Sequence, residues 1–123
     1  MSFREIKAFV RRARIDSVIY KLRAMGFKSI SVIAVDGVGS FVNPSDDRLS
    51  PKYVMNFSRV YKIELACRDE DEDEIVRLIG REAHSGEAGD GMIFVSDVER
   101  AVKIRTGREG PDVVERPTMS DKE

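Results

Sequence analysis

The stretch Ser85-Gly-Glu-Ala-Gly-Asp-Gly-Met-Ile-Phe-Val95 combines a glycine-rich turn with an apolar run, and the other elements of the sequence are arranged around it. Its three glycines, Gly86, Gly89 and Gly91, let the backbone adopt positive φ and approach a ligand closely. Asp90 favours a tight turn between two of them, and the apolar run that follows predicts a strand. A loop of this kind can present a row of N–H groups to an anion such as phosphate, although a lone G-x-G is more often a plain surface turn.

A pair of cations downstream favours the phosphate interpretation. In the segment Lys103-Ile-Arg-Thr-Gly107, Lys103 and Arg105 stand two residues apart. This spacing predicts that both lie on one face of a short strand over residues 101–105. The glycine loop and the cation pair together predict a phosphate pocket.

Length and composition limit the other possibilities. The 123 residues fit one domain, and 41% hydrophobic with 35% charged residues describe a soluble globular protein. A net charge of −1 argues against general affinity for nucleic acid, which requires a clustered basic excess. A single cysteine, Cys67, excludes an internal disulfide and fits a reducing compartment. Because the apolar runs are too short to cross a bilayer and no signal-peptide core is present, we expect a cytoplasmic protein that is not itself a membrane protein.

The spacing of the apolar residues predicts alternating strands and helices. A period of two predicts strands over residues 3–10, 28–35, 55–67 and 92–95. A period of 3.6 predicts a helix from Ile15 to Met25, ended by Gly26, and a second helix that begins within the acidic run 68–74. Six carboxylates at the start of that helix are better explained by its dipole than by a metal site.

Three segments lack such a pattern. The first strand is followed by Arg11, Arg12 and Arg14, which we interpret as a solvated rim because no aromatic residues are interleaved. Residues 40–52 hold two prolines and few apolar residues, so they are predicted to form a long loop, of the kind that is either functional or disordered. The charged tail, residues 109–123, is predicted to be flexible.

The predicted order is strand, helix, strand, loop, strand, helix, strand. The two strand–helix–strand halves, joined by the loop, match the α+β ferredoxin-like βαββαβ sandwich, in which both helices pack on one face of an antiparallel sheet. That fold hosts many functions, so the function has to be argued from the site.

Four motifs agree with those of a known family. The quoted stretch fits the signature Ser/Thr-x-x-x-Gly-Asp-Gly-Lys/Arg-Ile/Val-Phe at every place but one, and Ile104-Arg-Thr-Gly107 matches a closing motif. Val35-Asp-Gly-Val-Gly39 looks like the entry into a long flexible T-loop, and Lys62-Ile-Glu-Leu65 looks like the strand that leaves it. Over nearly its whole length the sequence therefore resembles the PII signal-transduction proteins, the nitrogen regulatory P-II family.

The resemblance implies a PII-like domain over residues 1–108 that forms homotrimers. It also implies that ATP or ADP binds in clefts between subunits, with Mg²⁺ accompanying ATP. A T-loop at about residues 38–54 would dock onto a target protein such as a membrane transporter, an enzyme or a regulator. Carried over by position, the nucleotide-binding residues are Ser31, Gly39, Glu64, Ala66, Gly89, Asp90, Gly91, Lys103 and Arg105.

The resemblance also assigns roles within that set. The Gly89-Asp-Gly91 segment would face the phosphates, and Lys103 and Arg105 would reach them from the facing subunit. The adenine and ribose would lie near Ser31, Glu64 and Ala66. Gly39 would open the T-loop beside the phosphates.

Several positions depart from the family pattern. Met92 stands where the family has Lys or Arg, and Phe41 replaces the T-loop glutamine that helps hold Mg-ATP and 2-oxoglutarate. Val60 replaces the lysine that binds the 2-oxoglutarate carboxylate, and the adjacent Arg59 is expected to point to the opposite face of its strand. Tyr53 aligns with the tyrosine that some members uridylylate, but its sequence context differs. The chain therefore resembles a divergent PII-like member.

Two other classes of protein stay open at this point. A small hydrolase on the same fold would need a nucleophile–base pair, and the sequence offers only isolated serines, Cys67 and His84. A structural trimer that has lost its ligand would not need the Gly-Asp-Gly loop together with Arg105. Titration with ATP and ADP separates the three classes.

Overall fold

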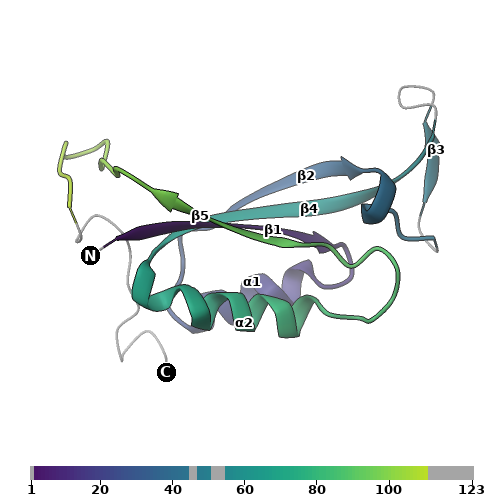
Figure 1. Ribbon diagram of the computed structural model, residues 1–123, viewed down its shortest axis with the longest axis horizontal. Helices are drawn as coiled ribbons and strands as arrows, with labels where there is room; N and C mark the ends of the chain where they lie inside the picture. The colour runs from purple at the N-terminus through teal and green to yellow at the C-terminus, as the bar shows by residue number, and fades with distance from the viewer. Residues whose placement is uncertain (1, 45–46, 51–54, 111–123) are drawn as a thin grey trace.

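The computed structural model describes residues 2–44, 47–50 and 55–110. The elements follow one another as β1 (Phe3–Arg11), α1 (Ile15–Ala24), β2 (Ser31–Gly37), the short 3₁₀ helix η1 (Gly39–Phe41), β3 (Arg48–Ser50), β4 (Met55–Arg68), η2 (Asp69–Asp71), α2 (Glu72–Ala83) and β5 (Ile93–Val98). Figure 1 shows them in two layers, with the sheet on one side and both helices on the other.

The sheet is antiparallel throughout. Its strand order is β2-β4-β1-β5, and the short β3 pairs with the far end of β4. With α1 and α2 packed on the same face, this is the βαββαβ ferredoxin-like arrangement. The predicted fold class is therefore confirmed.

The hydrophobic core lies between the sheet and the helices. In β1 the predicted alternation holds, since Ile6, Ala8 and Val10 are buried on the helix side. Burying a side chain as large as that of Ile6 or Val10 contributes about 1.5–3 kcal/mol. The helices cover these strand residues with Ile15, Val18, Leu22, Ile75, Leu78 and Ile79.

Both helix ends agree with the sequence. Gly26 has φ 98°, and its N–H bonds to the carbonyl of Arg23, so it ends α1 as predicted. Carboxylates occupy the first turn of α2, where the helix dipole stabilises negative charge. Within the described residues, neither helix is long and apolar enough to cross a membrane.

The opposite face of the sheet carries no helix, and we call it the open face. In β2, Val32 lies opposite the core residue Ile63, so Ile33 lies on the open face, opposite Lys62. In the same way Phe94 of β5 lies on the open face, opposite Lys7 of β1. Ile33 and Phe94 are both exposed large hydrophobic residues. The sheet therefore presents apolar surface that a single subunit does not cover.

Three predictions on secondary structure need correction. The strand expected at residues 28–35 begins at Ser31 and extends to Gly37, because it follows the pairing with β4. The loop expected at residues 40–52 contains η1 in part and all of β3. The strand expected at residues 101–105 does not form: only Val102 makes an isolated bridge, to Glu109.

The missing strand has a simple physical cause. β5 ends at Val98, and the chain then leaves the edge of the sheet, so residues 101–105 have no neighbouring strand in their own subunit. Ile104 is 99% exposed. Alternation in the sequence predicts a strand only where a partner edge is within reach.

Candidate functional site

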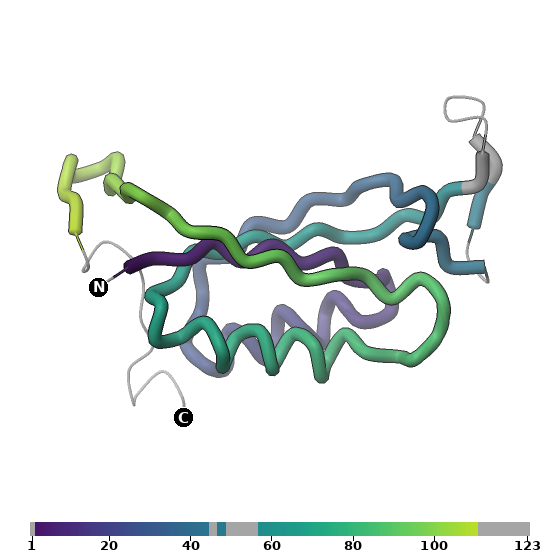
Figure 2. The backbone as a smooth tube through the Cα atoms, in the orientation of Figure 1, coloured from purple at the N-terminus to yellow at the C-terminus, as the bar shows by residue number. Residues whose placement is uncertain are grey.

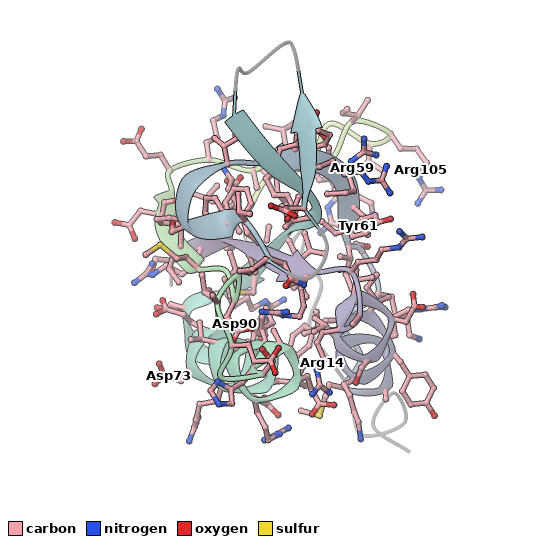
Figure 3. All side chains as sticks on the ribbon, turned by 90° about the vertical axis from the view of Figure 1, so that its right-hand side faces the viewer. Arg14, Arg59, Tyr61, Asp73, Asp90 and Arg105 are labelled. Atoms are coloured by element: carbon pink, nitrogen blue, oxygen red, sulfur yellow. The ribbon has the colours of Figure 1, made fainter. Side chains whose placement is uncertain are left out.

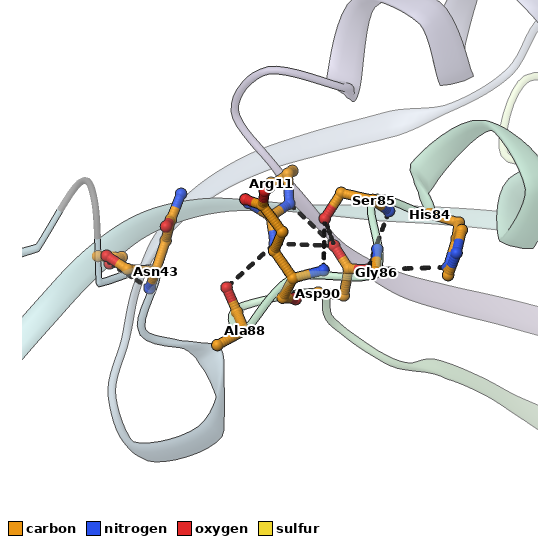
Figure 4. A network of polar contacts seen from close by, with 9 residues as sticks. Arg11, Asn43, His84, Ser85, Gly86, Ala88 and Asp90 are labelled. Carbon is orange, nitrogen blue, oxygen red and sulfur yellow. Dashed lines mark hydrogen bonds and ion pairs between the residues drawn. The ribbon is translucent and has the colours of Figure 1, made fainter.

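The loop between α2 and β5, residues 84–92, is organised around the carboxylate of Asp90. Its Oδ2 accepts hydrogen bonds of 2.9 Å from the backbone N–H groups of Ser85 and Gly86, and its Oδ1 accepts one of 2.7 Å from the Ser85 hydroxyl. Figure 4 shows these bonds closing the loop on itself. Asp90 therefore shapes the loop, and its charge is directed inward.

Arg11, at the end of β1, holds the loop from the sheet side. Its Nε lies 2.9 Å and its Nη2 lies 2.8 Å from Oδ1 of Asp90. Nη2 also donates to the carbonyls of Glu87 and Ala88, at 3.3 and 3.2 Å. Arg11 is only 7% exposed, so its interpretation as part of a solvated rim is wrong. The signal missed in the sequence was its position two residues beyond Phe9 on the open-face register of β1.

These contacts set the charge state of Asp90. Partial burial acts to raise the pKa of this carboxyl, but the hydrogen bonds from Ser85, Gly86 and Arg11 outweigh it and hold the pKa well below its usual range. The carboxylate is thus ionised throughout the physiological range.

We expect the substitution Asp90→Asn to flatten the dependence of stability on acid pH. Because the folded-state pKa is lowered, the stabilising contribution is fully present above the unfolded-state pKa of about 3.9 and is lost as the pH falls toward the folded-state value. Urea unfolding measured at neutral pH and at several pH values below about 4 tests this expectation.

The matched control is the exposed carboxylate of α2, changed as Asp73→Asn. Wild type and the Asp73→Asn variant should both lose stability more steeply in acid than the Asp90→Asn variant. Parallel pH profiles for all three proteins would show that the Asp90 network does not contribute to folding.

Two glycines of the loop are required by close approaches. A Cβ on Gly89, which has φ 100°, would lie 2.9 Å from Cα of Asn43, and a Cβ on Gly91 would lie 1.9 Å from the carbonyl oxygen of Phe9. The described residues provide no hydrogen-bond acceptor for the N–H of either glycine. Those two donors are what a phosphate-binding loop needs to offer.

Residues 38–43 lie where the T-loop is expected to begin, and we call them the base of the T-loop. Their Asn43 packs directly against Gly89 of the glycine loop. Gly39 has φ 67° at the start of η1. The ring of Phe41 lies 4.9 Å from the ring of Phe9 on β1. The N–H of Asn43 donates to Ser58 Oγ at 2.8 Å, which ties the segment to β4. Figure 2 shows this segment and the glycine loop at the same end of the sheet.

The residues expected near the adenine and ribose lie together on the open face. Ser31 of β2 is opposite Glu64 of β4, and Ala66 follows two residues later on the same side of β4. Glu64 forms an ion pair of 3.1 Å with Lys62. The structure thus brings Ser31, Glu64 and Ala66 together on one face of the sheet.

Lys103 and Arg105 lie elsewhere. They belong to the segment after β5, at the end of the molecule opposite the glycine loop (Figure 1). Both side chains are exposed, and the backbone around them turns, with the N–H of Gly107 donating to the carbonyl of Lys103 at 2.7 Å. The prediction that both cations share one strand face is therefore wrong. Within one subunit they cannot meet the loop.

Val60 and Arg59, the neighbouring residues at the position where the family binds the 2-oxoglutarate carboxylate, face different surroundings. Val60 is buried, and its Cγ2 would lie 3.3 Å from a Cβ added to Gly37. Arg59 points away from the core and pairs with Asp36 at 3.1 Å. Figure 3, viewed from the glycine-loop end, labels both Arg59 and Asp90. Tyr53 lies outside the described residues.

The thiol and the imidazole do not form a nucleophile–base pair. Cys67 is buried, and burial followed by the nearby carboxylates of Asp71 and Glu72 raises its pKa to about 11, so it is protonated and unreactive. His84 lies at the end of α2, with Nδ1 3.8 Å from Oδ2 of Asp90. Nothing in these surroundings activates Cys67.

Comparison of the sequence with known proteins identifies the family of this chain. Residues 3–108 match the family model described as nitrogen regulatory protein P-II. The nitrogen regulatory protein P-II of Azospirillum brasilense is 33% identical over 111 residues, covering 90% of this chain and 99% of the relative. Nitrogen regulatory protein P-II 2 of Methanothermobacter thermautotrophicus is 34% identical, covering 90% and 96%.

A solved structure agrees with these sequence matches. The crystal structure of Arabidopsis thaliana PII bound to citrate superposes with a TM-score of 0.73 and is 27% identical in sequence. The match covers 95% of this chain and 93% of the plant protein. With the family model spanning nearly all the described residues, the chain belongs to the nitrogen regulatory protein P-II family.

Proposed function

We propose that this protein binds ATP or ADP in clefts between the subunits of a homotrimer and regulates a target protein through its T-loop. As a P-II family member it is a signal-transduction protein and not an enzyme. One observation carries the proposal: the glycine loop and the Lys103–Arg105 segment lie at opposite ends of one subunit (Figure 1). A second subunit is needed to bring the two halves of a phosphate site together.

The chemistry of the two halves suits a nucleotide polyphosphate. The N–H groups of Gly89 and Gly91 supply directed donors, and Lys103 and Arg105 supply charge. On the open face, Ser31 offers a hydroxyl and Glu64 offers a carboxylate for the base and ribose. Mg²⁺ would accompany ATP and offset part of the phosphate charge.

The contact between the glycine loop and the base of the T-loop supplies a means of regulation. Gly89 lies against Asn43, and Phe41 lies against Phe9 beside Gly91. A nucleotide that moves the glycine loop by even a fraction of an ångström must therefore displace the base of the T-loop, because packed surfaces do not deform freely. The conformation offered to the target protein would then depend on which nucleotide is bound.

Light scattering coupled to size exclusion should report a homotrimer. The physical reason is the apolar surface left open on the sheet and beyond it, including Ile33, Phe94 and Ile104. In a cyclic trimer the glycine-loop end of each subunit can face the Lys103–Arg105 end of the next. A site that needs both ends can therefore form at every interface. A monomer at micromolar concentration would contradict the proposal.

We expect 2-oxoglutarate to have little effect on the Mg-ATP complex. Phe41 and Val60 provide no side-chain donor or charge, and Arg59 is already paired with Asp36. An unpaired carboxylate that is desolvated costs several kcal/mol. Calorimetric titration of 2-oxoglutarate into the Mg-ATP complex measures this, with ATP alone as the control. Saturable binding in the micromolar range would contradict the expectation.

A further inference from the structure

The glycine loop is bordered by apolar side chains on the open face. The N–H of Phe9 donates to the carbonyl of Met92 at 2.9 Å, so the pairing of β1 with β5 continues into the loop. Met92 therefore follows Gly91 on the open face, beside Phe9, and it is 54% exposed. Two further rings pack on the ring of Phe9, at centroid distances of 4.9 and 6.1 Å. We call these four side chains the apolar cluster: Phe9, Phe41, Met92 and Phe94.

The cations of the open face beside this cluster are already paired within the subunit. Arg11 is bound by the carboxylate of Asp90 and by two carbonyls of the glycine loop (Figure 4). Two lysines pair with carboxylates of their own strands, at 3.1 and 4.0 Å: Lys62 with Glu64, and Lys7 with Glu5. Among the described residues, this part of the open face therefore has no unpaired cation to offset the charge of a ligand.

The phosphate end of the site is thus rich in N–H donors and poor in positive charge. Gly89 and Gly91 offer backbone N–H groups, and a neighbouring subunit would add Lys103 and Arg105. A third phosphate adds one further negative charge, whether or not Mg²⁺ is bound to the nucleotide. It also brings more charged oxygens against the apolar cluster, and desolvating such oxygens without a partner is unfavourable.

We propose that the nucleotide site prefers ADP to ATP, and that Met92 is the residue that sets this preference. The inference rests on the proposed function, because it takes the phosphates to bind at the glycine loop. Met92 directly follows the N–H donor Gly91, so it lies at the phosphate end of the site. Its thioether carries no charge and is only a weak acceptor, so it cannot pair with a phosphate.

This preference decides which nucleotide the T-loop reports. When ADP and ATP compete for one site, occupancy depends on the ratio of their concentrations multiplied by the ratio of their affinities. A roughly 10-fold preference for ADP moves equal occupancy to about a 10-fold excess of ATP over ADP. The protein would therefore stay in its ADP complex until ATP is in large excess.

Calorimetry on the full chain tests the proposal by measuring the affinities of ADP and ATP, each with and without Mg²⁺. We expect ADP to bind roughly 10-fold more tightly than ATP under both conditions. The variant Met92→Lys adds a cation at the phosphate end. It should strengthen ATP binding roughly 10-fold and bring the two affinities close together.

The matched control is Ala24→Lys, which adds the same charge on the exposed surface of α1. Its ratio of ADP to ATP affinity should equal that of wild type. If wild type binds ATP as tightly as ADP or more tightly, the preference is overturned, and the third phosphate reaches another cation such as Arg12. If the Met92→Lys variant keeps the wild-type ratio, the role of Met92 is overturned. Failure of both nucleotides to bind would overturn the proposed function itself, so the two failures are distinguishable.

Discussion

The substitution Gly91→Ala should destabilise the protein strongly, because the added methyl group would overlap the backbone of β1. The new Cβ would lie 1.9 Å from the carbonyl oxygen of Phe9 and 2.7 Å from its carbon. Both atoms belong to the backbone of β1, which the Phe9 N–H holds to Met92 by a bond of 2.9 Å. Overpacking of this kind costs about 1–3 kcal/mol and sometimes more.

The matched control is Gly80→Ala in α2. A Cβ there meets nothing within 4 Å, so the only change is a gain in helix propensity. This variant should be more stable than wild type by about 0.5–1 kcal/mol. Urea unfolding of the three proteins measures both effects. Similar stability of the Gly91→Ala variant and wild type would mean that the glycine loop is not packed on β1.

The substitution Arg105→Ala should weaken the binding of ATP and ADP roughly 10- to 100-fold, because one charged hydrogen bond to phosphate is worth about 1.5–3 kcal/mol. Arg105 is exposed and makes no ion pair within the described residues, so its loss should leave folding unchanged. Arg23→Ala, an exposed arginine of α1, is the control for charge alone. Equal nucleotide affinity of the two variants would show that the phosphate site lies elsewhere.

Most of the fold could be predicted from the sequence, because its local signals agree with its tertiary packing. The alternation of Ile6, Ala8 and Val10 and the glycine after α1 each correspond to the observed element. The strand predicted at residues 101–105 failed, because alternation does not reveal whether a neighbouring strand exists. The same limit explains the shifted bounds of β2, which its pairing with β4 determines.

Part of the candidate site could likewise be predicted from the sequence, and part could not. The glycine loop could be predicted from Gly86, Gly89 and Gly91 together with Asp90, because these residue types favour turns and positive φ. The inward direction of Asp90 and its bond to Arg11 were not evident, because the two residues are 79 positions apart in the chain. A sequence pattern reports what lies nearby along the chain, whereas the Arg11–Asp90 ion pair depends on the fold, which brings the end of β1 beside the loop before β5.

We expect the glycine loop of one subunit and Arg105 of its neighbour to form a single phosphate site. Co-expressed mixed trimers of the Gly89→Ala and Arg105→Ala variants test it directly. In a cyclic trimer, a mixed assembly contains one interface at which an intact loop meets an intact arginine, so about one site in three should bind ATP with wild-type affinity. Neither variant alone should do so. Mixed trimers that bind ATP no more tightly than the two parent variants would show that the site is not shared between subunits.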